Sequence, residues 1–230
     1  RADRGMGGCW HRSKIDVTER TQQFIKESCE GDEPWMALCS YPDPHHPVCP
    51  PGPWFDRHSP NDMPLPQSRH DPLEHAPAHL RLFQGVHPSK QRDWVAPCGF
   101  GNDRLLSQAI AATYGMIEMV DEGVGQILRQ LEELGVRDNT IIVFTSDHGD
   151  MMGDHGLFLK GFMHYRGTLQ VPLIIDAPGM PALRYYGLSS SIDIAPTLLE
   201  LCSLAGCDGI QGKSLTPMLA DAAARVRDHI

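Results

Sequence analysis

Apolar residues recur in the middle of the chain at spacings that alternate between four and three. They stand at positions 106, 110, 113, 117, 120, 124, 127, 131 and 134, with Thr113 as the polar member. This spacing gives a helix one apolar face, so a long helix is predicted over 103–134. Gly115, Gly123 and Gly125 each weaken a helix by about 1 kcal/mol relative to alanine. Close packing against a sheet would explain these glycines.

Three short apolar runs, at 35–41, 141–144 and 171–175, predict buried strands. In the second run, three of the four residues are β-branched, which favours a strand buried on both faces. A shorter helix is predicted over 19–29 with Thr18 as its cap, and another over 197–205 with Asp193 as a candidate cap.

The stretch 48–103 holds many of the chain's 19 prolines and shows little periodicity. A long segment of this kind is usually functional cover or disordered. We interpret it as an irregular insertion over the edge of the sheet, in the manner of a lid. Residues 1–17 show no clear period and are expected to form a loop. Because no internal repeat or low-complexity segment divides the chain, a single domain over 1–230 is predicted.

Composition narrows the class of protein. Hydrophobic residues make up 41% and charged residues 21%, as in globular proteins. The formal net charge of −9 argues against a nucleic-acid surface, so no nucleic-acid partner is expected. The seven cysteines are irregularly spaced, and no two of them form a CxxC motif. This pattern favours reduced thiols and therefore a cytoplasmic location. No run of about 18 apolar residues exists, so no membrane span is predicted. The chain opens at Arg1 without an initiator methionine, so we expect a fragment.

Candidate chemistry follows the strand predicted at 141–144. Asp147, His148 and Gly149 come directly after it, where an open α/β sheet places its ligands. A carboxylate beside an imidazole on a rigid strand end suits a metal ion, and glycine lets the backbone turn or approach closely. The alternative is a plain turn, because turns after strands often carry Asp and Gly.

Two histidines follow the strand predicted at 35–41. His45 and His46 stand between Pro44 and Pro47, and prolines restrict the backbone on both sides. A rigid imidazole at a second strand end could meet Asp147 and His148 in space. The alternative is a proline-rich surface loop with incidental histidines, and the sequence favours neither.

Five segments together resemble the sulfatase family of the alkaline phosphatase superfamily. They are the run 138–149 that ends in Asp-His-Gly, the later Gly-Asp-His-Gly with Lys160 and Val-Pro-Leu-Ile-Ile, Pro-His-His-Pro at 44–47, the long helix around 119–128, and the markers at 191–199 and 212–215. The resemblance covers roughly 18–219 in the expected order. It implies a three-layer α/β/α sandwich with a mostly parallel central sheet, incomplete at its N-terminal side.

The resemblance also implies roles for four residues. Asp147 and His148 would bind one divalent metal ion, Lys160 would contact the oxyanion, and His45 would touch the sulfuryl or leaving oxygens. Carboxylate-rich ligation favours Ca²⁺, with Mn²⁺ or Mg²⁺ as alternatives. A cation, an ammonium group and an imidazole would stabilise the charge that develops on the ester oxygens. His155 and His164 have no firm counterpart in the family.

The family's nucleophile is a cysteine converted to formylglycine in a Cys-x-Pro/Ala-Ser-Arg motif, and no cysteine here stands in such a motif. We therefore expect formylglycine only in a preceding part of a longer enzyme, and this chain alone to be inactive. The expected activity is metal-dependent hydrolysis of small sulfate esters. Alternatives are hydrolysis of phosphonate monoesters or phosphodiesters, and a non-catalytic relative that binds an anion or a partner. Oligomeric state is left open.

Overall fold

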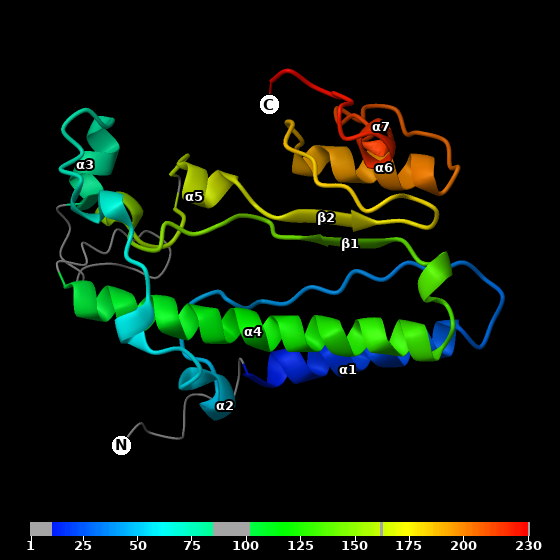
Figure 1. The fold of residues 1–230 in the computed structure, drawn as a ribbon, viewed down its shortest axis with the longest axis horizontal. Coiled ribbons are helices and arrows are strands. Elements are labelled where there is room, and N and C mark those ends of the chain that lie inside the picture. Colours follow the sequence, from blue (N-terminus) through cyan, green and yellow to red (C-terminus); the bar gives the residue numbers. More distant parts are fainter. Residues whose placement is uncertain (1–10, 85–101, 162, 230) are drawn as a thin grey trace. The chain divides into compact units, whose positions relative to one another are not determined.

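The computed structural model describes residues 11–84, 102–161 and 163–229 of the chain (Figure 1). Its contacts divide the chain into two compact units, which are described separately. The first comprises Arg1–Arg137 and His148–Gln170, and the second comprises Asp138–Asp147 and Val171–Ile230. Within the described ranges, no helix is both long enough and apolar enough to cross a membrane.

The first unit is helical. In chain order its elements are α1 (His11–Ser28), α2 (Gly52–Phe55), the 3-10 helices η1 (Pro60–Asp62) and η2 (Gln67–His70), α3 (Ala78–Gln84), α4 (Asp103–Glu133), η5 (Asp154–Gly156) and α5 (Arg166–Leu169). The 3-10 helix η4 (Arg137–Asn139) ends this part of the chain and leads into the second unit.

Helix α4 is the predicted long helix. The side chain of Asn102 caps it by accepting hydrogen bonds from the backbone N–H groups of Arg104 at 3.0 Å and Leu105 at 3.4 Å. Of the predicted face, Leu106, Ile110, Thr113 and Leu131 are buried. Met116 is also buried, at 1% exposed, whereas the predicted Ile117 is 48% exposed. Helices α1 and α2 both pack against α4.

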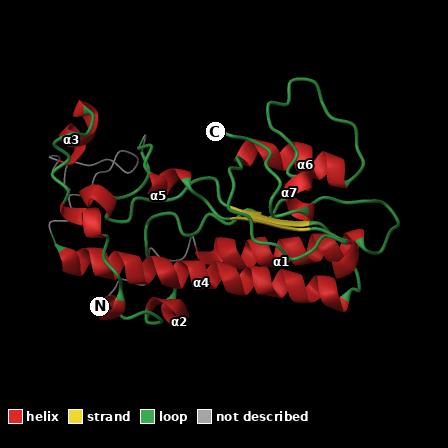
Figure 2. Ribbon diagram, turned by 45° about the horizontal axis from the view of Figure 1, so that its top comes forward, coloured by secondary structure: helices red, strands yellow, loops and turns green. Residues whose placement is uncertain are grey.

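Helix α1 lies along α4, as Figure 2 shows. It begins at His11, so the loop predicted for 11–17 is wrong, and residues 1–10 lie outside the described part of the chain. Thr18 is not a cap. It lies inside the helix, 2% exposed, and its hydroxyl is 2.9 Å from the hydroxyl of Tyr41. The cap prediction failed because this hydroxyl pairs with a distant side chain instead of the local backbone.

The strand predicted at 35–41 does not form. Residues 35–41 return along α1, with Trp35 set edge-on against Phe24 at 6.3 Å and Tyr41 hydrogen-bonded to Thr18. Met36 and Leu38, on alternate positions, are 78% and 88% exposed. The pattern suits a strand, but within the described residues no neighbouring strand pairs with it.

The second unit contains a two-stranded sheet formed by β1 (Ile142–Thr145) and β2 (Leu173–Asp176), with α6 and α7 on one side of it (Figures 1 and 2). The strands pair antiparallel, with Ile142 opposite Asp176 and Thr145 opposite Leu173. Two of the predicted strands therefore exist, but the mostly parallel central sheet is not present in the described residues. An apolar run marks a strand without encoding its direction, so the described pair leaves the predicted parallel sheet unconfirmed.

The burial predicted for these strands is also wrong. Phe144 is 39% exposed and Ile174 is 60% exposed, because in the described residues the sheet is only two strands wide. The combination of helices and strands agrees with an α/β protein, whereas the three-layer arrangement goes beyond these elements.

The C-terminal part of the second unit is built around Asp193. The 3-10 helix η6 (Ser191–Asp193) runs into α6 (Ile194–Leu201), and α7 (Thr216–Ala220) packs on α6. Asp193 is fully buried, and its carboxylate accepts hydrogen bonds from the backbone N–H groups of Ser190 and Lys213 and from Arg227. Asp193 stands at the N-cap position of α6, but its side chain caps no N–H group of that helix, so the predicted capping role is wrong. Its carboxylate instead ties three segments together.

Candidate functional site

Asp147 and His148 follow β1 directly, where the sequence predicted them. The end of β1 is fixed by Thr145, whose hydroxyl donates to the carbonyl of Pro172 at 2.9 Å. Asp147 is exposed at the end of the second unit, and the hydroxyl of Ser146 lies 3.4 Å from its carboxylate. A carboxylate presented in this way can accept from a donor or bind a cation.

His148 begins the returning part of the first unit and is half-buried. Its Nδ1 lies 2.9 Å from the carbonyl oxygen of Gly149. Because a carbonyl oxygen only accepts, Nδ1 carries the proton in the neutral ring and the lone pair lies on Nε2. This is the state in which an imidazole binds a metal ion.

Gly149 is required by the backbone beside it. A Cβ atom at this position would lie 2.0 Å from the carbonyl oxygen of Gly167. The N–H of Gly149 donates to the carbonyl of Thr168 at 2.9 Å. This close approach, which the sequence suggested for Gly149, holds the chain after His148 against the start of α5 (Arg166–Leu169).

Asp150 is a polar residue of the site that the sequence analysis overlooked. Its carboxylate accepts from the N–H of Met152 at 2.9 Å. Burial raises the pKa of Asp150, while the positive charges of Lys160 and His148 act in the opposite direction. His148 and Lys160 lie with Asp150 in the first unit. The signal was its place directly after Asp-His-Gly, before two apolar methionines.

Lys160 lies at the end of a loop that folds back on itself. The N–H of Met151 donates to the carbonyl of Leu159 at 2.9 Å, and that of Gly153 to the carbonyl of Leu157 at 2.8 Å. Leu157 is fully buried. Lys160 follows the last pair and is half-buried, so its amine is presented from an anchored segment.

His45 is exposed but well defined by its neighbour. Its ring stacks on that of His46 with centroids 4.0 Å apart, and its Nδ1 lies 2.8 Å from the carbonyl oxygen of His46. As in His148, that contact leaves the lone pair on Nε2. The restriction expected from the surrounding prolines agrees with this geometry. The convergence of His45 with Lys160 and Asp147 stays a prediction.

A second histidine, His155, has the contacts expected of a functional group. Its Nδ1 lies 2.7 Å from a carboxylate oxygen of Asp71, and its ring stacks on Tyr165 with centroids 4.3 Å apart. The hydrogen bond to His155 lowers the pKa of Asp71, after the larger effect of the Leu73 N–H. Sequence reasoning could not find this pair, because 84 residues separate its members.

The described residues do not provide a complete set of ligands for a metal ion. No group of three or more His, Cys, Asp or Glu side chains is arranged there to hold a cation. The oxygen of Asp147 and the Nε2 lone pair of His148 suit a divalent ion chemically. They account for two ligands, whereas six to eight are usual for Ca²⁺.

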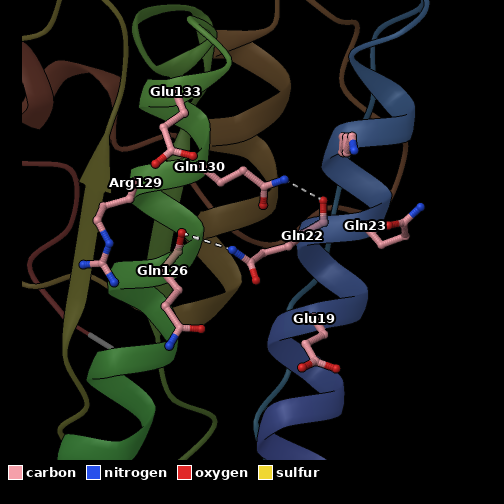
Figure 3. A pocket seen from close by; sticks show the side chains of 8 residues that line it. Glu19, Gln22, Gln23, Gln126, Arg129, Gln130 and Glu133 are labelled. Atoms are coloured by element: carbon pink, nitrogen blue, oxygen red, sulfur yellow. Dashed lines mark hydrogen bonds between the residues drawn. The ribbon is translucent and has the colours of Figure 1, made fainter.

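A polar cleft of about 450 Å³ lies between α1 and α4 and contains none of the predicted site residues (Figure 3). Two glutamine side chains cross it, Gln22 to the carbonyl of Gln126 at 3.4 Å and Gln130 to the carbonyl of Gln22 at 2.9 Å. Each amide binds the backbone of the other helix, so these two hydrogen bonds link α1 to α4 across the cleft.

Comparison with known proteins places these residues in context. The family model described as Sulfatase matches residues 5–204. An arylsulfatase of Clostridium perfringens is 34% identical over 93% of this chain and 43% of its own length. A choline-sulfatase of Rhizobium meliloti is 28% identical over 86% of this chain and 38% of its own.

Among solved structures, a phosphonate monoester hydrolase from Silicibacter pomeroyi matches with a TM-score of 0.77 and 28% identity. The match covers 94% of this chain and 43% of that one. The chain thus spans about two fifths of the length of the proteins it matches.

Proposed function

Because the chain belongs to the sulfatase family, we propose that it forms part of an enzyme that hydrolyses sulfate esters. One observation carries the proposal: the family match over 5–204 includes all four predicted site residues, His45, Asp147, His148 and Lys160. The placement of His148 and Lys160 in the same compact unit supports it.

Each residue has a role that its chemistry can fill. The ammonium group of Lys160 would bind the ester's non-bridging oxygens. His45, in its protonated imidazolium form, would donate from Nε2 to the sulfuryl or leaving oxygen. Asp147 and His148 would contribute ligands to a divalent cation, for which Ca²⁺ is proposed ahead of Mn²⁺ or Mg²⁺. When bound, that cation would neutralise charge on the ester oxygens.

Two further parts of the proposal concern the whole protein. The formylglycine nucleophile is assigned to sequence outside residues 1–230, because no cysteine here has the required neighbours. A three-layer α/β/α sandwich is proposed for the complete domain, supported by the TM-score of 0.77 with a homologue of more than twice this chain's matched length.

The test is hydrolysis of an aryl sulfate by the full-length gene product and its variants. Lys160→Ala is expected to lower kcat by about 100- to 1000-fold, the usual loss when one oxyanion donor is removed. Asp147→Asn is expected to lower kcat as well, because it removes the charge of a proposed metal ligand. Asp208→Asn, an exposed carboxylate outside the proposed site, is the matched control. Wild-type rates in both site variants would refute the proposal.

Phosphonate monoester hydrolysis is the second candidate, favoured by the structural match to the Silicibacter pomeroyi enzyme. Sulfate and phosphonate monoesters both present anionic oxygens to Lys160 and a cation, so the site residues suit either. Comparison of kcat/KM for an aryl sulfate and an aryl phosphonate separates the two. A higher value for the phosphonate would replace the first proposal with the second.

A further inference from the structure

We propose that a polar clamp formed by Ser68, Asp71, Asp154 and His155 positions Lys160 for the reaction. This inference rests on the proposed function, because it concerns the residue that binds the ester's oxygens. The clamp joins the proline-rich segment 48–103 to the tip of the loop that carries Lys160. It gives that segment a role in catalysis through contacts within the first unit.

The loop is stiff between its tip and Lys160. Two backbone pairs, Met151 with Leu159 and Gly153 with Leu157, connect its arms. At Gly153, a Cβ atom would lie 2.6 Å from the side chain of Leu106 in α4. A displacement of the tip is therefore transmitted along the paired arms to Lys160.

The clamp holds the tip from three sides. The hydroxyl of Ser68 donates to the carboxylate of Asp154 and accepts from the N–H of His155 at 3.1 Å. The ring of His155 donates to Asp71 at 2.7 Å and stacks on Tyr165. His155 has a φ of 54°, a backbone conformation that a non-glycine residue keeps only when its contacts hold it there.

An apolar cluster lies beneath the same two segments. Leu73 and Leu80 of the proline-rich segment pack with Met151, Leu157 and Met163 of the loop, and all are buried. Apolar contacts are non-directional, so they hold the segments together without fixing the loop's direction. Hydrogen bonds are directional, so the clamp fixes the orientation of the loop and with it the position of the Lys160 amine.

Because the clamp is partly exposed, we expect it to matter more for the position of Lys160 than for the stability of the fold. The side chains of His155 and Asp71 are 25% and 37% exposed, and ion pairs at such sites contribute little to folding. Contacts of small energetic value can still fix geometry, and a displacement of about 1 Å in an active site can lower the rate about 100-fold. The buried cluster beneath is expected to keep the loop folded in clamp variants.

The experiment is a double-mutant cycle in the full-length enzyme, with hydrolysis of an aryl sulfate as the readout. His155→Ala is expected to lower kcat by about 10- to 100-fold. In a Lys160→Ala background, the same change is expected to cause no further loss, because there is no amine left to position. His155→Asn should restore most of the rate, since asparagine tolerates this φ and its amide can donate to Asp71.

Control variants distinguish a failure of the clamp proposal from a failure of the proposed function. His164→Ala changes an exposed histidine of the same segment and should leave the rate unchanged. If His155→Ala does not fold, Asp71→Ala takes its place in the cycle. A loss that adds fully to that of Lys160→Ala, or no loss, overturns the clamp. Full activity in Lys160→Ala itself instead refutes the proposed function.

Discussion

The hydroxyl oxygens of Thr18 and Tyr41 lie 2.9 Å apart and join helix α1 (His11–Ser28) to the chain that returns along it. Thr18 is 2% exposed. Burial raises the pKa of Tyr41 to about 12, although its hydrogen bond with Thr18 acts in the opposite direction. The phenol is therefore neutral in the folded protein at physiological pH, and it retains the proton with which it can donate.

Replacing Thr18 with valine preserves the side chain's volume and removes its hydroxyl. Thr18→Val is expected to lower the free energy of unfolding by about 1–2 kcal/mol, because Tyr41 loses a buried partner. Thr18→Ser keeps the hydroxyl and should cost less. Urea unfolding of the three proteins measures the difference, and equal midpoints in all of them would show that this contact contributes nothing.

Two glycines of α4 (Asp103–Glu133) should respond oppositely to alanine. At Gly115 a Cβ atom would lie 2.3 Å from the backbone oxygen of Trp54, so Gly115→Ala is expected to destabilise the fold by about 1–3 kcal/mol. At Gly125 the nearest atom is the end of the Arg129 side chain at 3.4 Å. Gly125→Ala should therefore stabilise the helix by about 1 kcal/mol. Thermal unfolding of both variants tests the contrast.

The Asp71 carboxylate should make stability depend on pH in the acid range. Its pKa is lowered from 3.8 in the folded protein, because the ion accepts from the Leu73 N–H and pairs with His155. A lowered pKa stabilises the fold above the unfolded value, and this contribution disappears as the pH falls through the folded value. Because Asp71 is partly exposed, the effect should be small, with Asp71→Asn slightly less stable than wild type near neutral pH.

Well below pH 3.8 the same variant should match the wild type, because both side chains are then neutral. Chemical denaturation at the two pH values measures this. A difference that persists unchanged in acid would mean that the charge of Asp71 is not its cause.

Asp193 is expected to be the most sensitive position of the second unit. It is fully buried and paired with Arg227, whose side chain is 11% exposed. Asp193→Ala would leave that guanidinium without its carboxylate, a change that typically costs about 3–5 kcal/mol. Asp208→Ala, at an exposed position, should stay within about 0.5 kcal/mol of wild type. Denaturant unfolding that ranked the two variants equally would contradict this account.

The spacing of apolar residues along the chain predicted the positions of one helix and two strands. The alternating spacing located α4 nearly to the residue, and the apolar runs located β1 and β2. The predicted face of α4 was right in part, because Leu106, Ile110, Thr113 and Leu131 are buried. It missed the buried Met116 and Met119 and included Ile117, which is 48% exposed. Spacing alone does not show which neighbours a helix will meet.

Strand partners and long-range pairs could not be predicted. The run at 35–41 carries a strand-like pattern, but it pairs with α1 side chains instead of another strand. The sequence predicted Asp147, His148 and Lys160 as site residues, and these stay predictions, whereas the contacts of Asp150 and the pair of His155 with Asp71 came only from the structure. Their interactions depend on burial and on contacts between distant segments.

The alternate side chains Met36 and Leu38 have a practical consequence for preparing this polypeptide. These two large apolar side chains are exposed on the extended segment 35–41. An exposed extended segment of this kind is a template to which another molecule can add a strand. Leu38→Lys is therefore expected to reduce the self-association of this polypeptide at high concentration, which light scattering would measure.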